Sequence, residues 1–297
     1  MPEPAINPGK LRLAYVNDLT TLPVTYQISA NLRSAAVAEG TMAEVRGMML
    51  DGAADIAFLP AADILINPNL MLVTCGGITV NGASNLILLA SKVLPSEVGR
   101  VLVDSNDMGA IGLAQYVLAS KLRIRPEFYQ AEAPLNPAHF DFNADPHDAY
   151  LLTGLNAVIV RRQAFAWAND LTQAWQEMTG APFVLWGWAV NKGTAIGTID
   201  KEITELVRRN SFELPAMARR YAEEHSLPAA SVEAFLARVL KTDLGTNEIT
   251  SMRRFGKEMH QSGILEYTPQ LPLYQTTTTG TRGGAGSTKP GAGTKGR

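Results

Sequence analysis

Apolar residues in the first part of the chain form short runs separated by polar turns. Such runs, rich in β-branched side chains, are typical of buried strands. The predicted strands cover residues 11–16, 54–61, 70–80 and 85–91. Thr41 and Glu44 have the spacing of a capping box, and apolar residues recur at helical intervals from Val45 until Asp51. Strands alternating with helices predict a mostly parallel sheet.

A second unit of the same kind begins near residues 92–99. Its predicted strands cover residues 100–103, 126–130 and 148–154, and its helices cover 108–120 and 162–179. A long apolar strand follows at 182–192, and helices are predicted at 198–209, 214–225, 231–239 and 248–262.

This order of elements predicts a two-lobed α/β fold with a helical C-terminal part. We expect residues 10–95 and 190–270 to form the first lobe and residues 96–189 the second. The strand at 182–192 would carry the chain back from one lobe to the other. In folds of this type the ligand lies in a cleft near strand ends and helix N-termini.

Composition excludes several classes of protein. The chain has 297 residues, a net charge of −2 and a single cysteine, Cys75. One cysteine rules out a disulfide framework, and a near-neutral charge disfavours nucleic-acid binding. No apolar run approaches the roughly 20 residues that span a bilayer. Without a leader-like start we expect a cytoplasmic protein, and residues 276–297, which lack large apolar side chains, are predicted to be a disordered tail.

Polar residues gather where predicted strands begin or end. Helix N-termini, hydroxyls and amides in such places can bind carboxylates or phosphates. The candidates are Asn17, Ser84, Asn85, Ser105, Asn106, Thr153 and Gly154. Each also has an ordinary structural interpretation, because the same residue types cap helices and form turns.

The sequence contains no recognisable metal-binding motif and no motif of a catalytic nucleophile. The four histidines lack metal-ligand spacing, and we interpret the loop with His139, Asp141, Asp145 and His147 as a solvated loop. There is no nucleophile elbow, Walker loop or dinucleotide-binding fingerprint. Cys75, in an apolar strand, is predicted to be an inert core residue. We therefore expect neither a metal nor a cofactor.

Several segments occur in an order and at spacings that are known from one protein family. They are LRLAYVN (11–17), TMAEVRGMMLDGAADIAFLPAADIL (41–65), NGASNLILLAS (81–91), VLVDSNDMGAIGLAQYVL (101–118), DAYLLTG (148–154) and LTQAWQEMTGAPFVLWGWAVNK (171–192). In these segments the chain resembles the chorismate dehydratases of the futalosine route to menaquinone.

The resemblance implies a type II periplasmic-binding-protein-like fold and a lyase. Such an enzyme removes water from chorismate to give an enolpyruvyl-substituted benzoate, without a cofactor. By matching position, Asn17 would orient the substrate or assist proton transfer, and Ser105, Asn106, Thr153 and Gly154 would bind the substrate. Ser84 and Asn85 lie near the position of the family's active-site serine, so Ser84 is the second candidate catalytic residue and Asn85 a further candidate for substrate binding.

The chain departs from the family pattern at three places. Leu86 aligns with the family's active-site serine, Leu155 stands where the family tends to have aspartate, and Asp18–Leu22 separate Asn17 from the next proline. Two other functions therefore stay open: a paralogue acting on another small carboxylate, and a cytoplasmic binding or sensing module.

Overall fold

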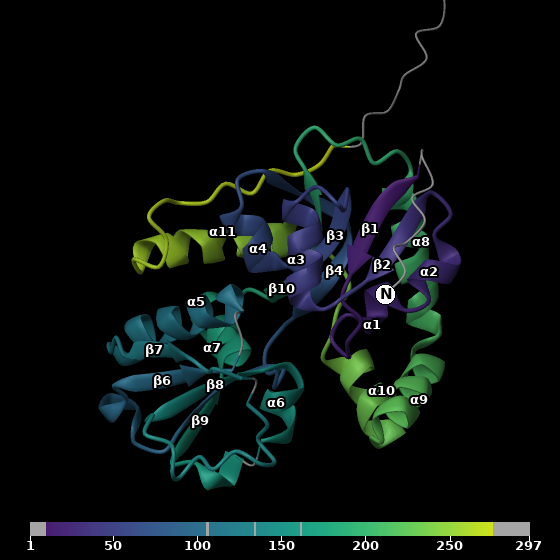
Figure 1. Ribbon diagram of the computed structural model, residues 1–297. Helices are drawn as coiled ribbons and strands as arrows, with labels where there is room; N and C mark the ends of the chain where they lie inside the picture. Colours follow the sequence, from purple (N-terminus) through teal and green to yellow (C-terminus); the bar gives the residue numbers. More distant parts are fainter. Residues whose placement is uncertain (1–9, 105–106, 134, 161, 276–297) are drawn as a thin grey trace, which may run out of the picture.

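The computed structural model describes residues 10–104, 107–133, 135–160 and 162–275, which fold into two α/β lobes (Figure 1). Each lobe is built on a five-stranded sheet. The strand order is β2-β1-β3-β10-β4 in the first sheet and β7-β6-β8-β5-β9 in the second. The predicted fold class, two α/β lobes with C-terminal helices, is confirmed.

The first sheet is mixed rather than mostly parallel. Its strands are β1 (Leu11–Tyr15), β2 (Ala35–Glu39), β3 (Ile56–Pro60), β4 (Leu70–Val80) and β10 (Phe183–Asn191). β2, β1 and β3 run parallel, whereas β10 is antiparallel to both β3 and β4. β10 is antiparallel because the chain comes from the second lobe and enters this sheet at the edge where β3 and β4 end.

Helices of the first lobe pack around this sheet. They are α1 (Leu22–Thr25), α2 (Ile28–Asn31), α3 (Met42–Leu50), α4 (Ala61–Ile66), α8 (Ile199–Phe212), α9 (Leu214–His225), α10 (Ala229–Arg238) and α11 (Thr246–Gln261). The capping box predicted at Thr41 and Glu44 begins α3. The four predicted C-terminal helices are confirmed as α8 to α11, and the α9–α10 pair projects from the lobe (Figure 1, green).

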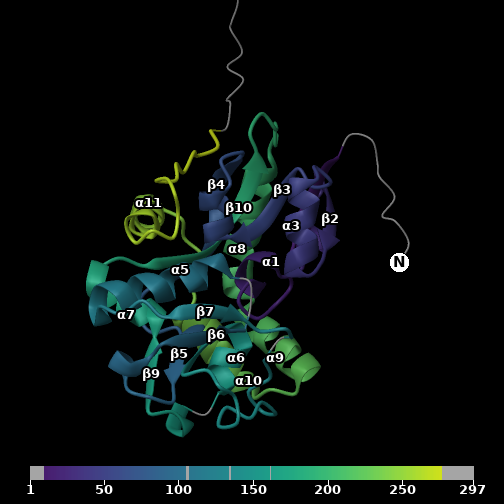
Figure 2. The ribbon, with the colours of Figure 1, turned by 60° about the vertical axis from the view of Figure 1, so that its left-hand side comes forward.

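The second lobe contains the other sheet and three α-helices. Its elements are β5 (Ile87–Ser91), β6 (Arg100–Val103), β7 (Glu127–Gln130), β8 (Ala149–Thr153), β9 (Trp167–Asp170), α5 (Met108–Val117), α6 (Gly154–Ile159) and α7 (Leu171–Thr179), with short turns at Pro95–Glu97, Leu118–Leu122 and Arg162–Ala164. Figure 2 shows α5 and α7 between the second sheet and the first lobe.

Two strands were not predicted. β2 is alanine-rich, so its sequence carries little strand signal, and it is fixed by pairing with β1 along its whole length. β9 lies within the predicted helix at 162–179, where Trp167–Asp170 pairs antiparallel with β5. The helix begins only after Asp170, whose side chain accepts hydrogen bonds from the backbone N–H groups of Thr172 and Gln173.

The sheets assign two strands differently from the predicted lobe boundaries. β5 lies within residues 10–95, which are predicted for the first lobe together with 190–270, but it pairs in the second sheet. Most of β10 lies within residues 96–189, which are predicted for the second lobe, but it pairs in the first sheet. By strand pairing, the chain passes from the first lobe to the second between β4 and β5, and it returns between α7 and β10. Each strand joins the sheet that can satisfy its backbone hydrogen bonds. The boundaries of the folding units themselves stay a prediction.

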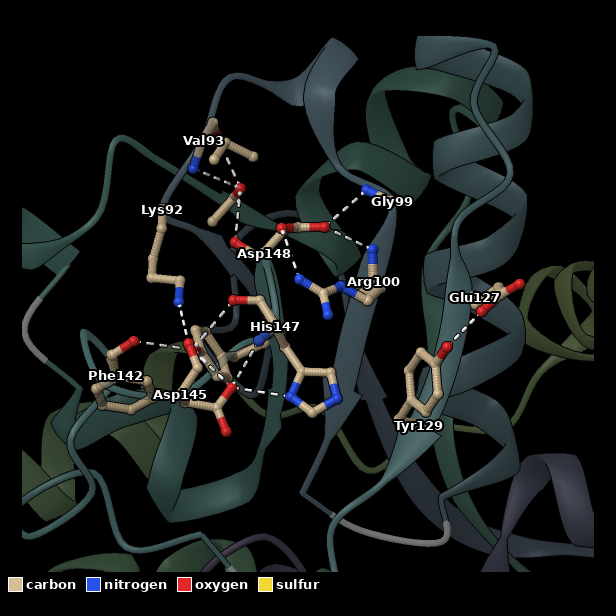
Figure 3. Close-up of polar contacts among 12 residues, drawn as sticks. Lys92, Val93, Gly99, Arg100, Glu127, Tyr129, Phe142, Asp145, His147 and Asp148 are labelled. Carbon is tan, nitrogen blue, oxygen red and sulfur yellow. Dashed lines mark hydrogen bonds and ion pairs between the residues drawn. The ribbon is translucent and has the colours of Figure 1, made fainter.

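The acidic loop before β8 is tied to the second lobe (Figure 3). The buried Tyr150 hydroxyl donates to Asp145 Oδ1 at 3.0 Å, and His147 Nδ1 lies 2.8 Å from the same oxygen. Lys92 Nζ donates to the Asp145 carbonyl at 2.6 Å. The loop is therefore held by specific hydrogen bonds rather than simply solvated.

Two absences concern the part of the chain that the structure describes. Within it, no helix is both long and apolar enough to cross a membrane. Within the same residues, no three His, Cys, Asp or Glu side chains gather as metal ligands would. The predicted tail at 276–297 lies outside the described residues.

Candidate active site

A cavity of about 360 Å³ opens between the lobes, at the ends of β1, β3 and β8. Both lobes contribute to its wall. The first lobe supplies Asp18, Thr20, Met42, Ala43, Arg46, Pro60, Leu185 and Trp186. The segment between β4 and β5 supplies Leu86, and the second lobe supplies Ile87, Asp107, Thr153 and Gly154. The wall thus combines a few charged and hydroxyl groups with a mainly apolar surface, which is typical of small-molecule sites.

Arg46 is the cation of this cavity. It lies in α3, whose first turns also bring Met42 and Ala43 to the wall. Its guanidinium donates from Nε to Asp63 Oδ2 at 2.6 Å and from an Nη atom to Asp63 Oδ1 at 3.1 Å. Burial raises the pKa of the Asp63 carboxyl, and the Arg46 partner only partly offsets this. The pairing fixes the direction of the guanidinium while leaving it at the cavity wall.

Asp107 reaches the cavity from the second lobe. It is the N-cap of α5, and its Oδ1 accepts hydrogen bonds from Gly109 N at 2.9 Å and Ala110 N at 3.1 Å. Burial raises the pKa of this carboxyl more than those bonds and Arg46 lower it. Gly109 allows a close approach here, because a Cβ would lie 3.1 Å from Asp107 Oδ1 and 3.3 Å from Ala62 Cβ in the first lobe.

Asp18 is the second carboxylate on the wall, and it comes from the first lobe. Its Oδ1 accepts from the Thr20 amide at 2.7 Å, the Thr20 hydroxyl at 2.6 Å and the Thr21 amide at 3.1 Å. These contacts form a tight turn after β1, and Thr20 lies on the cavity wall as well. Asp18, Arg46 and Asp107 are not among the predicted site residues, because none of the three belongs to a recognisable motif.

Thr153 and Gly154 are the predicted site residues that line this cavity. The Thr153 amide donates to Asp104 Oδ2 at 3.0 Å and its hydroxyl donates to Asp104 Oδ1 at 3.1 Å. Gly154, with a φ of +56°, donates its N–H to the Leu86 carbonyl at 2.8 Å. Ser105 and Asn106, also predicted to bind substrate, lie outside the described residues.

Asn17 lies in a neighbouring pocket of about 220 Å³ between the end of β1 and α9. Its Nδ2 donates to Glu39 Oε1 at 3.3 Å, and the Tyr15 hydroxyl donates to the same carboxylate at 2.7 Å. Burial and the Glu39 carboxylate raise the pKa of Tyr15 to about 12. Asn17 is not on the wall of the larger cavity, although its neighbour Asp18 is.

Ser84 and Asn85 lie in the crossing between the lobes rather than on the cavity wall. Ser84 is fully buried, and its Oγ accepts from the Leu86 amide at 3.1 Å and the Thr172 hydroxyl at 2.9 Å. Asn85 has a φ of +59° and donates its N–H to Asp170 Oδ2 at 2.5 Å. The side chain that reaches the cavity from this segment is Leu86.

Replacing Ser84 by alanine is expected to lower the free energy of unfolding by about 1–3 kcal/mol, because the buried Leu86 amide loses its acceptor. Urea denaturation measures this loss. Ser91→Ala is the matched control, since Ser91 is equally buried at the other end of β5 and also accepts a nearby amide. If Ser84→Ala lost turnover at a stability equal to that of the control, Ser84 would have a direct role in the reaction.

The two lobes and the cleft between them define a periplasmic-binding-protein-like fold, and solved structures share this fold. Protein AF1704 from Archaeoglobus fulgidus is similar with a TM-score of 0.69 and 14% identity, over 88% of this chain and 100% of that one. The periplasmic aliphatic sulphonate binding protein SsuA from Escherichia coli is similar with a TM-score of 0.60 and 9% identity, over 95% and 99%. The alkanesulfonate-binding protein SsuA from Xanthomonas axonopodis pv. citri, bound to MOPS, gives 0.59 and 15%, over 89% and 97%.

Sequence comparison identifies a family, whereas the structural comparison identifies only a fold. The family described as menaquinone biosynthesis matches residues 11–261, and the chain belongs to this family. No curated protein matches the chain. The family identified by resemblance in the sequence, whose members serve menaquinone formation, agrees with this assignment.

Proposed function

We propose that this protein is a carbon–oxygen lyase that dehydrates chorismate to an enolpyruvyl-substituted benzoate in the interlobe cavity. The observation that carries the proposal is Arg46, a cation in an otherwise mainly apolar cavity of a menaquinone biosynthesis family member. Chorismate has an apolar ring and two carboxylates, so it needs an apolar surface and a fixed positive charge. We place this chemistry in the cytoplasm, as the sequence predicts.

The cavity offers groups suited to each part of chorismate. Arg46, at the wall beside the first turn of α3, would hold one carboxylate, which the positive end of that helix also favours. Met42, Leu86 and Trp186 provide apolar surface for the ring. Thr20 and Thr153 bring hydroxyl groups to the same wall. Loss of water makes the ring aromatic, so the protein mainly has to orient the substrate and exclude side reactions.

The predicted site residues take unequal parts in this proposal. Thr153 and Gly154 line the cavity, so the proposal keeps for both the substrate-binding role that the sequence predicts. The predicted roles of Asn17 in orienting the substrate and of Ser84, Asn85, Ser105 and Asn106 stay predictions. For Asn17 to act, the substrate would have to extend past Asp18 toward Glu39.

Incubating the purified protein with chorismate tests the proposal. We expect an enzyme-dependent aromatic absorbance and a product lighter than chorismate by one water. Matched samples with heat-denatured protein control for spontaneous breakdown of chorismate. A folded protein that gives no such product would contradict the lyase proposal.

A second function, binding without chemistry, is favoured by Leu86. This apolar side chain lies on the cavity wall where the resembling family has an active-site serine, and the two sulfonate-binding neighbours share the fold. If chorismate raised the melting temperature without being consumed, a binding module or a paralogue for another small carboxylate would replace the lyase. If chorismate neither raised the melting temperature nor was consumed, it would be excluded as the ligand.

A further inference from the structure

We propose that Trp186 determines which carboxylates the interlobe cavity accepts. Its indole is a platform that favours a flat, unsaturated ring over a puckered, saturated one. Because the ligand is taken to be a ring-bearing carboxylate held at Arg46, this selection rests on the proposed function. The class of ring and the side chain that selects it are what it adds.

Trp186 is the one aromatic side chain among the described residues that line the cavity. It is half-buried, whereas Trp175 and Trp188 are fully buried in the core. Trp167 is half-buried too, but it pairs with Ser91 at the end of β5 remote from the cavity. A change at Trp186 is therefore expected to alter the cavity wall rather than the centre of the core.

A β-bulge in β10 directs Trp186 to the cavity. Val184 pairs with Thr79 of β4, and Trp186 pairs with Ile78, the adjacent residue of that strand. Leu185 is therefore the extra residue of the bulge. Successive residues of a regular strand point to opposite faces, yet Leu185 and Trp186 both line the cavity. The bulge accounts for this, since bulges beside active sites commonly redirect a side chain.

Phe58 on β3 fixes the orientation of the indole. Its ring is fully buried and stacks on Trp186, with the ring centroids 5.8 Å apart and the planes inclined by 18°. The same ring packs against Trp188 with a centroid distance of 4.7 Å. A side chain that is already held in place loses little freedom when a ligand binds to it. A ligand ring on the opposite face of the indole would extend this stack.

The indole and the cation of the cavity are connected through the end of β3. Trp186 pairs with Pro60, the last residue of β3, which also lines the cavity. Helix α4 follows directly, and its Asp63 accepts a hydrogen bond from the Arg46 guanidinium. Both groups are thereby fixed on the wall of the first lobe. We place the carboxylate of the ligand at Arg46 and its ring on Trp186.

Stacking explains why the platform distinguishes between rings. Offset stacking requires two flat faces, and such pairs add about 2- to 10-fold in affinity beyond the burial of apolar area. The axial hydrogens of a saturated ring keep its carbon atoms away from the indole. The conjugated ring of chorismate and the aromatic ring of its dehydration product both belong to the flatter class.

Benzoate and cyclohexanecarboxylate test this selection, because they differ in the saturation of the ring and each carries one carboxylate at neutral pH. We expect the wild-type protein to bind benzoate about 2- to 10-fold more tightly in ligand-observed NMR titrations. Trp186→Leu keeps an apolar side chain without the platform, so the preference should disappear. Trp186→Phe retains a flat ring and should keep the preference. A preference for benzoate that persisted in Trp186→Leu would overturn the role of Trp186.

Trp167→Leu is the matched control. It removes a half-buried indole from β9, outside the cavity. We expect this variant to keep the benzoate preference of the wild-type protein. If Trp167→Leu lost the preference as fully as Trp186→Leu, selection would not depend on the cavity wall, and the role of Trp186 would be overturned.

Turnover of chorismate and discrimination between the two probes are separate results. A wild-type protein that prefers benzoate but leaves chorismate intact would retain the platform in a binding protein, and the lyase proposal alone would fall. A protein that dehydrates chorismate but binds the two probes equally, or binds neither, would retain the lyase proposal and overturn the platform.

Discussion

Exchanging Arg46 for glutamine is expected to raise the KM for chorismate by about 10- to 100-fold, because a hydrogen bond to a charged group contributes roughly 1.5–3 kcal/mol. Glutamine keeps the length of the side chain but cannot offer a positive charge to the substrate carboxylate. Initial rates over a range of chorismate concentrations measure the effect. A KM equal to that of the wild-type protein would show that the carboxylate binds elsewhere.

The double variant Arg46→Gln/Asp63→Asn separates binding from stability. In the single variant the Asp63 carboxylate loses its partner while only 13% of its side chain is exposed, which we expect to cost about 1–3 kcal/mol of stability. Neutralising Asp63 should recover that stability without restoring the KM. If the double variant also recovered the KM, Arg46 would act through the local fold rather than by contacting the substrate.

Replacing Trp175 by alanine is expected to destabilise the protein by about 3–5 kcal/mol, the usual effect of removing a large buried aromatic side chain. Trp175 on α7 is fully buried and makes edge contacts with Tyr116, Phe183 and Phe255. Its N–H lies 3.2 Å from the Pro182 carbonyl and 3.3 Å from Ser251 Oγ. One side chain thereby joins α5 and α7 of the second lobe to β10 and α11.

Guanidinium denaturation of the wild-type protein, of Trp175→Ala and of the matched variant Trp175→Phe measures this contribution. Phenylalanine keeps much of the ring packing and loses only the N–H contacts, so its loss of stability should be clearly smaller than that of alanine. Equal losses for the two variants would mean that the hydrogen bonds, rather than the packed ring, hold this junction. A loss below about 1 kcal/mol for alanine, typical of a surface substitution, would contradict the packing account.

Much of the fold was predictable from the sequence because its signals are local. The capping box at Thr41 and the amphipathic C-terminal helices specify their own structure, and both are confirmed. β2 and β9 carry no comparable signal, since an alanine-rich segment and a segment beside a helix cap become strands only by pairing with β1 and β5. The antiparallel direction of β10 depends on the path of the chain through the second lobe, which no local pattern encodes.

The candidate site was less predictable, because its charged groups meet only in three dimensions. Thr153 and Gly154 are predicted from their place after a strand, and both line the cavity. Arg46 lies in mid-helix and Asp107 resembles an ordinary cap, so neither is distinguished by sequence alone. Ser84 was considered because it lies near the position of the family's serine, and the structure places its hydroxyl in a buried contact with Thr172.

A crystal structure of the protein with the enolpyruvyl-substituted benzoate product bound tests the central claim most directly. We predict that the product lies in the interlobe cavity, with a carboxylate at the Arg46 guanidinium. Product bound in the neighbouring pocket instead, against Asn17 and Glu39, would contradict the proposed site and the role given to Arg46.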